Sequence, residues 1–305
     1  MGVSGFFRKL FGLKGAVEER DDDPARGRDV FELAQRLGIG VDQLRAARAE
    51  YREFEIPKRS GGKRRIAAPA PELKALQRRI LRRLLGKLAS HPSATGFEKR
   101  HSIVTNAKPH AGAAVVVRMD LRDFFTSTGS KRVRAYFRKI GWNGEASDLL
   151  TNLCTFNGGL PQGAPTSPRL SNLVNYRLDT RLLKLGDRFG AAYSRYADDI
   201  TFSFRKDDRV VVHAVIHATK EIVGDEGYKL HQRRKLQIRR RSDRQVVTGL
   251  VVNVRPNLPR QVRRRLRAVE HHAKAGKPAT LSAQQLEGWR SLRSMIARQN
   301  GAAPG

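Results

Sequence analysis

Apolar residues recur along the chain at two spacings, and these predict a mixture of helices and strands. From Pro71 to about Ala89 they stand three or four residues apart, which is the spacing of one helical face. Residues 114–120 form an apolar run that ends in an aspartate, and residues 193–204 are rich in aromatic and β-branched types, so both predict strands. Further helices are expected at 29–37, 131–140, 145–155, 168–184, 208–224, 261–275 and 282–299, and short strands at 53–56, 65–68, 235–240 and 245–252. Strands in the middle with helices at both ends predict an α+β fold.

The charge of the chain points to a polyanionic partner. Lysine and arginine number 60 against 29 acidic residues, which gives a net charge of +31. Such an excess is typical of proteins that bind nucleic acid. Hydrophobic residues make up 39% of the chain, enough for a packed core and too many for a disordered basic tail.

Cysteine content and hydropathy exclude several other classes. Cys154 is the only cysteine, which rules out an internal disulfide and a four-cysteine zinc site. No apolar run is long enough to span a bilayer, and Arg8 and Lys9 interrupt the N-terminal apolar stretch that a signal peptide would need. We therefore expect a cytoplasmic protein that makes no membrane contact.

The polar face of the predicted helix 71–89 is almost entirely basic. Glu72 is the single acidic residue of this segment, and a nearly unopposed basic face predicts a surface that follows phosphates. The arginines expected to contact RNA there are Arg78, Arg79, Arg82 and Arg83.

Three aspartates stand where strands end or turn. Asp120 ends the apolar run, and Asp198 and Asp199 lie in the middle of the aromatic segment. Adjacent carboxylates repel unless a cation binds between them, and their hard oxygens suit two magnesium ions that activate a hydroxyl and hold a pyrophosphate. The alternative is an Asp-Asp turn that caps a hairpin.

Four motifs in order make the chain resemble the reverse transcriptases. They are Gly62-Lys63-Arg64-Arg65-Ile66, Met119-Asp120-Leu121-Arg122-Asp123-Phe124-Phe125, Gly159-Leu160-Pro161-Gln162-Gly163 through Pro168, and Tyr196-Ala197-Asp198-Asp199. The resemblance implies a right-hand polymerase fold. It divides the chain into fingers at 51–110, a palm with an antiparallel sheet at 111–252 (with an insertion of the fingers at about 131–165), and a helical thumb at 253–305. Residues 1–50 match nothing in the family and are expected to be a basic, helical extension.

Two further elements resemble the bacterial retron branch. One is Asn106-Ala107-Lys108-Pro109-His110, and the other is Val247-Thr248-Gly249. The resemblance implies an enzyme that binds a cognate non-coding RNA and copies part of it into cDNA from a 2′-hydroxyl, with a separate effector protein, in anti-phage defence. Two alternatives remain: a small reverse transcriptase that extends a conventional 3′-hydroxyl, and a non-catalytic RNA-binding module on the same fold.

The same resemblance implies a role for each motif residue. Asp120 and Asp198, with the carbonyl of Leu121, would bind two Mg²⁺ ions, and Asp199 would support them. Deoxynucleoside triphosphates would contact Lys63, Arg64, Arg65, Phe125 (as a gate against the ribose 2′-hydroxyl) and Gln162.

The remaining motif residues are expected to bind RNA. In the thumb these are Arg263, Arg264 and Arg267. Asn106 and His110 would hydrogen-bond folded RNA and its 2′-hydroxyls, or would act as turn and cap residues that stabilise the fold. Val247, Thr248 and Gly249 are expected to bind the same RNA.

Overall fold

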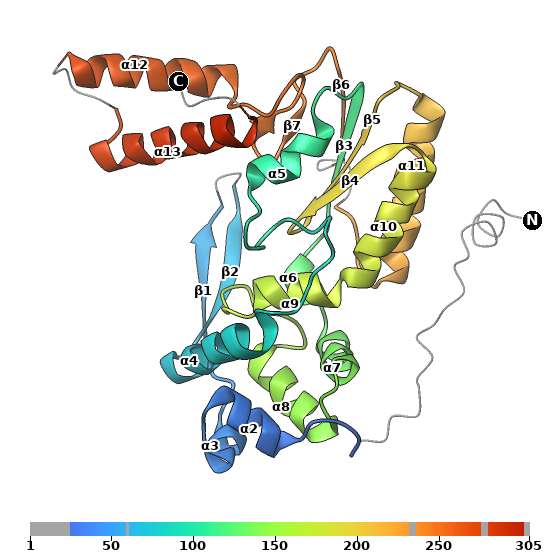
Figure 1. The fold of residues 1–305 in the computed structure, drawn as a ribbon, viewed down its shortest axis with the longest axis vertical. Helices are drawn as coiled ribbons and strands as arrows, with labels where there is room; N and C mark the ends of the chain where they lie inside the picture. Colours follow the sequence, from blue (N-terminus) through green and yellow to red (C-terminus); the bar gives the residue numbers. More distant parts are fainter. Residues whose placement is uncertain (1–24, 59–60, 232–235, 276–279, 302–305) are drawn as a thin grey trace, which may run out of the picture.

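A computed structural model describes residues 25–58, 61–231, 236–275 and 280–301 (Figure 1). The expectations for the basic start of the chain, residues 1–24, and for Lys235 lie outside these ranges. Within them, no helix is long and apolar enough to cross a membrane.

A four-stranded antiparallel sheet lies at the centre, in the order β4 (Ala191–Tyr196), β5 (Asp199–Phe204), β3 (Val115–Asp120), β6 (Gln237–Arg240). Helices α10 (Tyr176–Arg188) and α11 (Arg209–Asp225) cover one face of it (Figure 1).

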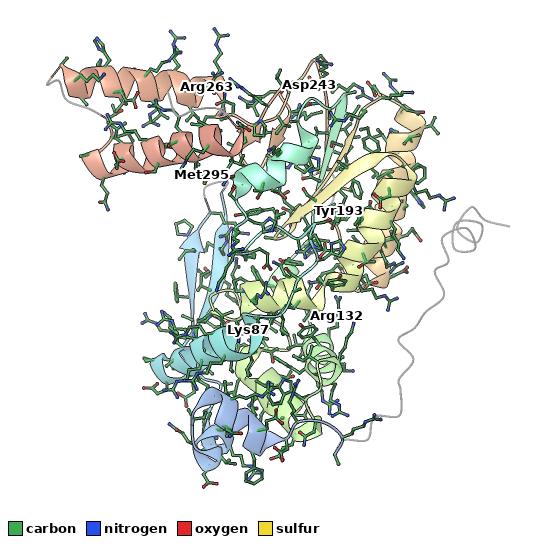
Figure 2. The ribbon with its side chains drawn as sticks, viewed as in Figure 1. Lys87, Arg132, Tyr193, Asp243, Arg263 and Met295 are labelled. Atoms are coloured by element: carbon green, nitrogen blue, oxygen red, sulfur yellow. The ribbon has the colours of Figure 1, made fainter. Side chains whose placement is uncertain are left out.

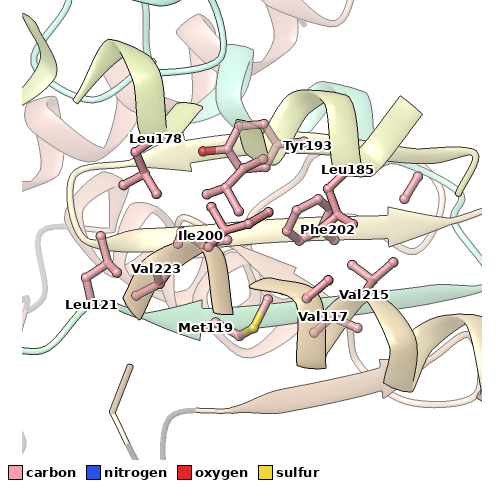
Figure 3. Packing of buried hydrophobic residues seen from close by; sticks show 14 of the residues in the cluster. Val117, Met119, Leu121, Leu178, Leu185, Tyr193, Ile200, Phe202, Val215 and Val223 are labelled. Carbon is pink, nitrogen blue, oxygen red and sulfur yellow. The ribbon is translucent and has the colours of Figure 1, made fainter. Parts of the chain in front are cut away.

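Successive side chains of a strand point to opposite faces of the sheet, and this alternation decides which of them contact α10 and α11. Val117 and Met119 of β3 and Phe202 of β5 point toward α10 and α11 and form a dry core with them (Figure 3). Residues at the intervening positions point to the opposite face, which carries the functional side chains described below.

A second core joins the helices of the lower half of Figure 1. Its members are α2 (Val30–Leu37), α3 (Val41–Ala46), α4 (Pro71–Ile80) with the π-helical turn η1 (Leu81–Leu85), α7 (Ser130–Lys139), α8 (Gly144–Cys154) and α9 (Ser167–Val174). Val30 and Leu33 are fully buried in this core. The part of residues 1–50 that the structure describes is therefore packed into the body of the protein.

Two strands stand apart from the main sheet as a hairpin. β1 (Tyr51–Pro57) pairs with β2 (Lys63–Pro69), with Glu55 opposite Arg65. This confirms the predicted strand pair, and its outer end is mostly exposed.

A third core connects the sheet to the C-terminal helices. It contains α5 (Ile103–Ala107) with the short 3₁₀ turn η2 (Lys108–His110), β7 (Val246–Val247), β8 (Leu250–Val251), α12 (Arg260–Lys274) and α13 (Ala283–Gln299). Helices α12 and α13 pack against each other and project from the sheet end of the molecule (Figure 1). Ser282 and Gln285 form a capping box at the start of α13.

Three predicted elements differ from the observed ones. The helix expected at 168–184 is two helices, α9 and α10, that meet at Asn175. The helix from Pro71 ends its α-helical part at Ile80 and continues as η1 to Leu85. The strand expected at 245–252 is a tight hairpin, because Thr248 and Gly249 both have positive φ and reverse the chain between β7 and β8.

Candidate active site

The three predicted aspartates lie at the same end of the central sheet. Asp120 on β3 stands directly opposite Asp199 on β5, so the two side chains share the face that α10 and α11 leave open. The backbone N–H of Leu121 donates to the carbonyl of Asp198 at 2.9 Å, which draws the β4–β5 turn against the end of β3. The structure thus brings together Asp120, Leu121, Asp198 and Asp199.

Arg118 balances the like charges that the strand register places opposite each other. Its guanidinium Nη2 lies 2.5 Å from Oδ2 of Asp199, on the same face and one diagonal step along the ladder. Opposed carboxylates destabilise a strand pair, and an adjacent cation offsets the repulsion. Sequence reasoning missed this role, because Arg118 interrupts an apolar run and its partner lies 81 residues away.

The segment after α11 borders the same site. The backbone N–H of His231 donates to the carbonyl of Asp120 at 2.9 Å, and its Nε2 lies 3.4 Å from Oδ1 of Asp120. Among the residues that the structure describes, no three His, Cys, Asp or Glu side chains are gathered closely enough to form a metal-ligand cluster. The register leaves Asp120 and Asp199 as an opposed pair of carboxylates, with Asp198 in the adjoining turn. Carboxylate oxygens of this kind could hold a hard divalent cation that keeps waters and substrate phosphates as further ligands.

Three aromatic rings lie near one another beside the turn that carries Asp198. Phe125 is half-buried, and its ring centroid lies 6.0 Å from that of Phe97, which in turn lies 6.4 Å from Tyr196. Phe97 is 47% exposed and has a φ of +63°, a conformation that non-glycine residues adopt at a cost in free energy. An exposed, strained aromatic beside the site is a candidate contact for nucleic acid, and no sequence signal marks its backbone conformation.

The loop that carries Gln162 supports the β1–β2 hairpin. The carbonyl of Gln162 accepts from the N–H of Ala67 on β2 at 2.9 Å. Gly163 has a φ of +133°, and a Cβ there would lie 2.9 Å from the carbonyl oxygen of Ala67. Glycine is required at this position because two backbones touch, and the side chain of Gln162 remains partly exposed.

The three predicted nucleotide-binding cations divide between the two faces of the hairpin. Lys63 lies 2.9 Å from Glu55, and Arg65 lies 3.9 Å from Glu53, both as exposed ion pairs. Arg64 points to the other face, which it shares with Ile66, a neighbour of Gly163. The site residues thus include one hairpin cation on the side of the Gln162 loop and two on the opposite side.

Two arginines on the basic face of α4 and η1 bind the end of a neighbouring helix. Arg79 donates to the carbonyl of Gly38 at 3.2 Å, and Arg83 donates to the carbonyl of Arg36 at 3.3 Å. These are carbonyls at the C-terminus of α2, where cations are favourable. All four arginines are exposed, so the RNA contacts expected of them stay a prediction. Arg79 and Arg83 also bind the end of α2, whereas Arg82 donates to the carbonyl of Arg78 in its own helix at 3.2 Å.

The structure also corrects the expectation that Asn106 and His110 contact RNA. Asn106 is buried and accepts from the hydroxyl of Thr95 at 2.7 Å. His110 is fully buried, and its two ring nitrogens lie 2.8 Å from the hydroxyls of Ser194 and Ser203. Burial, aided by the charge of Arg205, lowers the pKa of His110 to about 3, so the ring stays neutral. The alternative reading, a role in stabilising the fold, holds for both side chains.

The segment Val247-Thr248-Gly249 packs against α5, the helix that carries Asn106. Val247 is fully buried, which corrects its predicted RNA contact as well. The hydroxyl of Thr248 donates to the carbonyl of Ile103 at 2.8 Å, and Gly249 completes the hairpin turn. From the other side, Ser102 donates to the side chain of Gln299 on α13 at 2.6 Å. The two elements together join the sheet to the C-terminal helices.

Helix α12 presents the remaining predicted RNA contacts. Arg263, Arg264 and Arg267 are exposed, and side chains project into solvent along the helix (Figure 2). Leu266 and Val269 are buried against the rest of the protein, so α12 has one apolar and one strongly basic face.

Comparison with known proteins covers most of the chain. Residues 56–250 match the family described as "Reverse transcriptase (RNA-dependent DNA polymerase)". The chain is 39% identical to the retron Mx162 reverse transcriptase of Myxococcus xanthus, over 89% of this chain and 64% of that protein. It is 38% identical to the retron Mx65 reverse transcriptase of Myxococcus xanthus, over 87% of this chain and 67% of that protein. It is 36% identical to the retron Ec86 reverse transcriptase of Escherichia coli, over 87% of this chain and 83% of that protein. The chain thus spans about two thirds of the two Myxococcus relatives.

Proposed function

The chain belongs to the retron reverse transcriptases, and from this premise we propose that it binds a cognate structured non-coding RNA and copies part of it into single-stranded DNA. The observation that carries the proposal is the register that sets Asp120 opposite Asp199, with Asp198 drawn in by Leu121. In the proposal, synthesis starts from a 2′-hydroxyl of the RNA and leaves a branched RNA–DNA product. A separate effector protein and a role in anti-phage defence are part of the same proposal.

The architecture supports a division into fingers, palm and thumb. In this proposal the β1–β2 hairpin belongs to the fingers, the central sheet with α10 and α11 forms the palm, and α12 with α13 forms the thumb. The buried contacts of residues 102–110 with the β7–β8 hairpin then form the joint between palm and thumb.

The carboxylates fit a site for two Mg²⁺ ions. Asp120 and Asp198, with the carbonyl of Leu121, would hold the metal, and Asp199, which is paired with Arg118, would support the site. Bound divalent ions lower the pKa of an attacking hydroxyl and neutralise triphosphate charge. The task of the protein is to keep these oxygens fixed on a rigid strand pair, which lowers the cost of reorganisation during nucleotidyl transfer.

The hairpin and the aromatic rings would receive the deoxynucleoside triphosphate. We assign the phosphates to Lys63, Arg64 and Arg65, with Arg64 the strongest candidate because it lies on the side of the Gln162 loop. The ring of Phe125 would exclude a ribose 2′-hydroxyl. Gln162 would contact the nucleotide or template from a loop that is fixed to β2.

RNA would bind along the exposed cations. On α12 these are Arg263, Arg264 and Arg267, and on the α4–η1 face they are Arg78 and Arg82. Arginine contacts to phosphates position a folded RNA without reading its bases.

Asp198→Asn tests this proposal, because it removes one carboxylate charge at nearly constant size. DNA synthesis with magnesium should be abolished, while copurification of RNA should persist. Asp148→Asn is the matched control, since this carboxylate on α8 pairs with Arg134 and lies outside the site. Sequencing the nucleic acid that copurifies with the parent should reveal a short branched RNA–DNA. Substantial synthesis by Asp198→Asn would refute the metal assignment, and unbranched cDNA would favour 3′-hydroxyl priming.

A further inference from the structure

A fully buried arginine lies directly behind the turn that carries Asp198. Arg195, on β4, points to the α10 side of the sheet, and neither its side chain nor that of Asp179 on α10 is exposed at all. The guanidinium and the carboxylate form a two-pronged pair, with Nε to Oδ1 at 2.7 Å and Nη2 to Oδ2 at 2.6 Å. The hydroxyl of Tyr193 donates to Oδ1 of Asp179 at 2.7 Å and completes the pair.

The third nitrogen of this guanidinium reaches the turn itself. Nη1 of Arg195 donates to the carbonyl of Ala197 at 2.9 Å and to Oδ1 of Asn172 at 3.2 Å. The guanidinium carbon also lies 5.4 Å from the centre of the Phe124 ring, which follows Asp120 in the chain. One side chain therefore contacts both segments that carry the carboxylates of the site.

The turn needs such support because its backbone is strained. Ala197 has a φ of +57°, in the region that favours glycine. A residue held there persists only where the surroundings determine its conformation. A second contact comes from Gly96. Its backbone lies so close to the turn that a Cβ there would be 2.6 Å from the backbone nitrogen of Ala197.

The backbone of Arg195 is fixed as firmly as its side chain. Its N–H donates to the carbonyl of Ser93 at 2.8 Å, and its carbonyl accepts from the N–H of Thr95 at 2.9 Å. Burial alone would lower the pKa of Arg195, but Asp179 raises it above the ordinary value, so the side chain stays charged. Asp179, Arg195 and the turn therefore form one rigid unit.

We propose that Arg195 is a positioning residue for the reaction: it holds the carbonyl of Ala197 and thereby fixes Asp198 where a divalent ion is bound. The inference rests on the proposed metal role of Asp198. A buried ion pair alone is weak support for a stabilising role, and the contact to the turn distinguishes this one.

Arg195→Lys tests the proposal, because lysine retains the charge next to Asp179 and loses the fork that reaches Ala197. A displaced carboxylate should lower kcat by on the order of 10–100-fold, with the KM for deoxynucleotide nearly unchanged. Titration with Mn²⁺ alone, followed by electron paramagnetic resonance, should show weaker metal binding. Arg181→Lys is the matched control, because Arg181 forms a similar fork on α10 with Asp225 and Glu226 and does not contact the turn. It should lower Tm without changing kcat or Mn²⁺ affinity.

Ala197→Gly keeps the test valid where Arg195→Lys folds poorly. Glycine accepts a positive φ without strain, so Tm should be equal to or above that of the parent. Glycine also adopts other conformations at little cost, so the turn should hold Asp198 less firmly, and kcat and Mn²⁺ affinity should fall. In the double variant the losses should be smaller than the product of the single losses, because both act on one turn. Unchanged kcat and Mn²⁺ affinity in either single variant would overturn the proposal. If Asp198→Asn itself retains synthesis, the proposed metal site fails, and that outcome is separate from the failure of Arg195 to act on it.

Discussion

Lowering the pH should weaken the fold through the buried side chain of His110. His110 carries a pKa of about 3 in the folded protein against an ordinary value of 6.5. Its neutral ring has one N–H and one lone pair, which match two serine hydroxyls at 2.8 Å. A protonated ring would carry a buried charge without a carboxylate partner among these contacts.

The direction follows from where the proton binds. Between the two pKa values the unfolded chain binds the proton and the folded chain does not, so this contribution to stability is complete above about pH 6.5 and falls as the pH is lowered toward 3. Each pH unit within that window costs about 1.4 kcal/mol. On going from pH 7 to about pH 5, only the last 1.5 pH units or so lie below the unfolded pKa. The free energy of unfolding should therefore fall by about 2 kcal/mol.

Urea unfolding of the parent and of His110→Gln at several pH values measures this loss. Glutamine retains a donor and an acceptor but does not titrate, so the difference in the free energy of unfolding between the two proteins should shrink by about 2 kcal/mol from pH 7 to about pH 5. Other groups titrate equally in both proteins and cancel in the difference. Parallel curves for the parent and His110→Gln would refute the reasoning.

Two further predictions concern substrate and RNA. Phe125→Ala should raise the ratio of ribonucleotide to deoxyribonucleotide incorporation, on the order of tenfold to a hundredfold, in single-nucleotide extension assays; an equal fall of both rates would mean that the ring only packs. Replacing Arg78 and Arg82 with glutamine should make the log–log salt dependence of RNA affinity shallower by about 1.4, because about 0.7 is lost per phosphate contact on a single strand. The same change at Arg79 and Arg83 should lower Tm and leave that slope nearly unchanged, and the opposite pattern would contradict the assignment of the two pairs.

The hydrophobic pattern predicted the secondary structure well because the apolar positions are the ones that the cores use. The run 114–120 became β3, and the aromatic segment became β4 and β5 with the aspartates at their turn. The resemblance to reverse transcriptases implied that Asp120, Asp198 and Asp199 share one site. The structure sets Asp120 opposite Asp199 on paired strands, and the metal roles stay a proposal.

The roles of polar residues were harder to predict, because they depend on partners far away in the chain. His110 is a satisfied core residue only because Ser194 on β4 and Ser203 on β5, more than 80 residues later in the chain, place their hydroxyls against its ring. In the sequence, Arg79 and Arg83 are part of a basic helix face. Their hydrogen bonds to the last carbonyls of α2 depend on where α2 packs, which the sequence does not show. Arg118 and Arg195 carried no motif of their own that sequence reasoning could weigh.

The alternation of side chains along β3 limits where natural variation in chain length can occur. Val117 and Met119 face the helices, while Arg118 and Asp120 face the site, and β5 and β6 pair with the strand on both sides. An insertion or deletion of one residue inside β3 would send Asp120 into the apolar layer beneath α11 and turn valines toward the substrate. Related chains that keep the activity should therefore differ in length only outside 115–120 and 199–204, in segments such as the turn between β1 and β2.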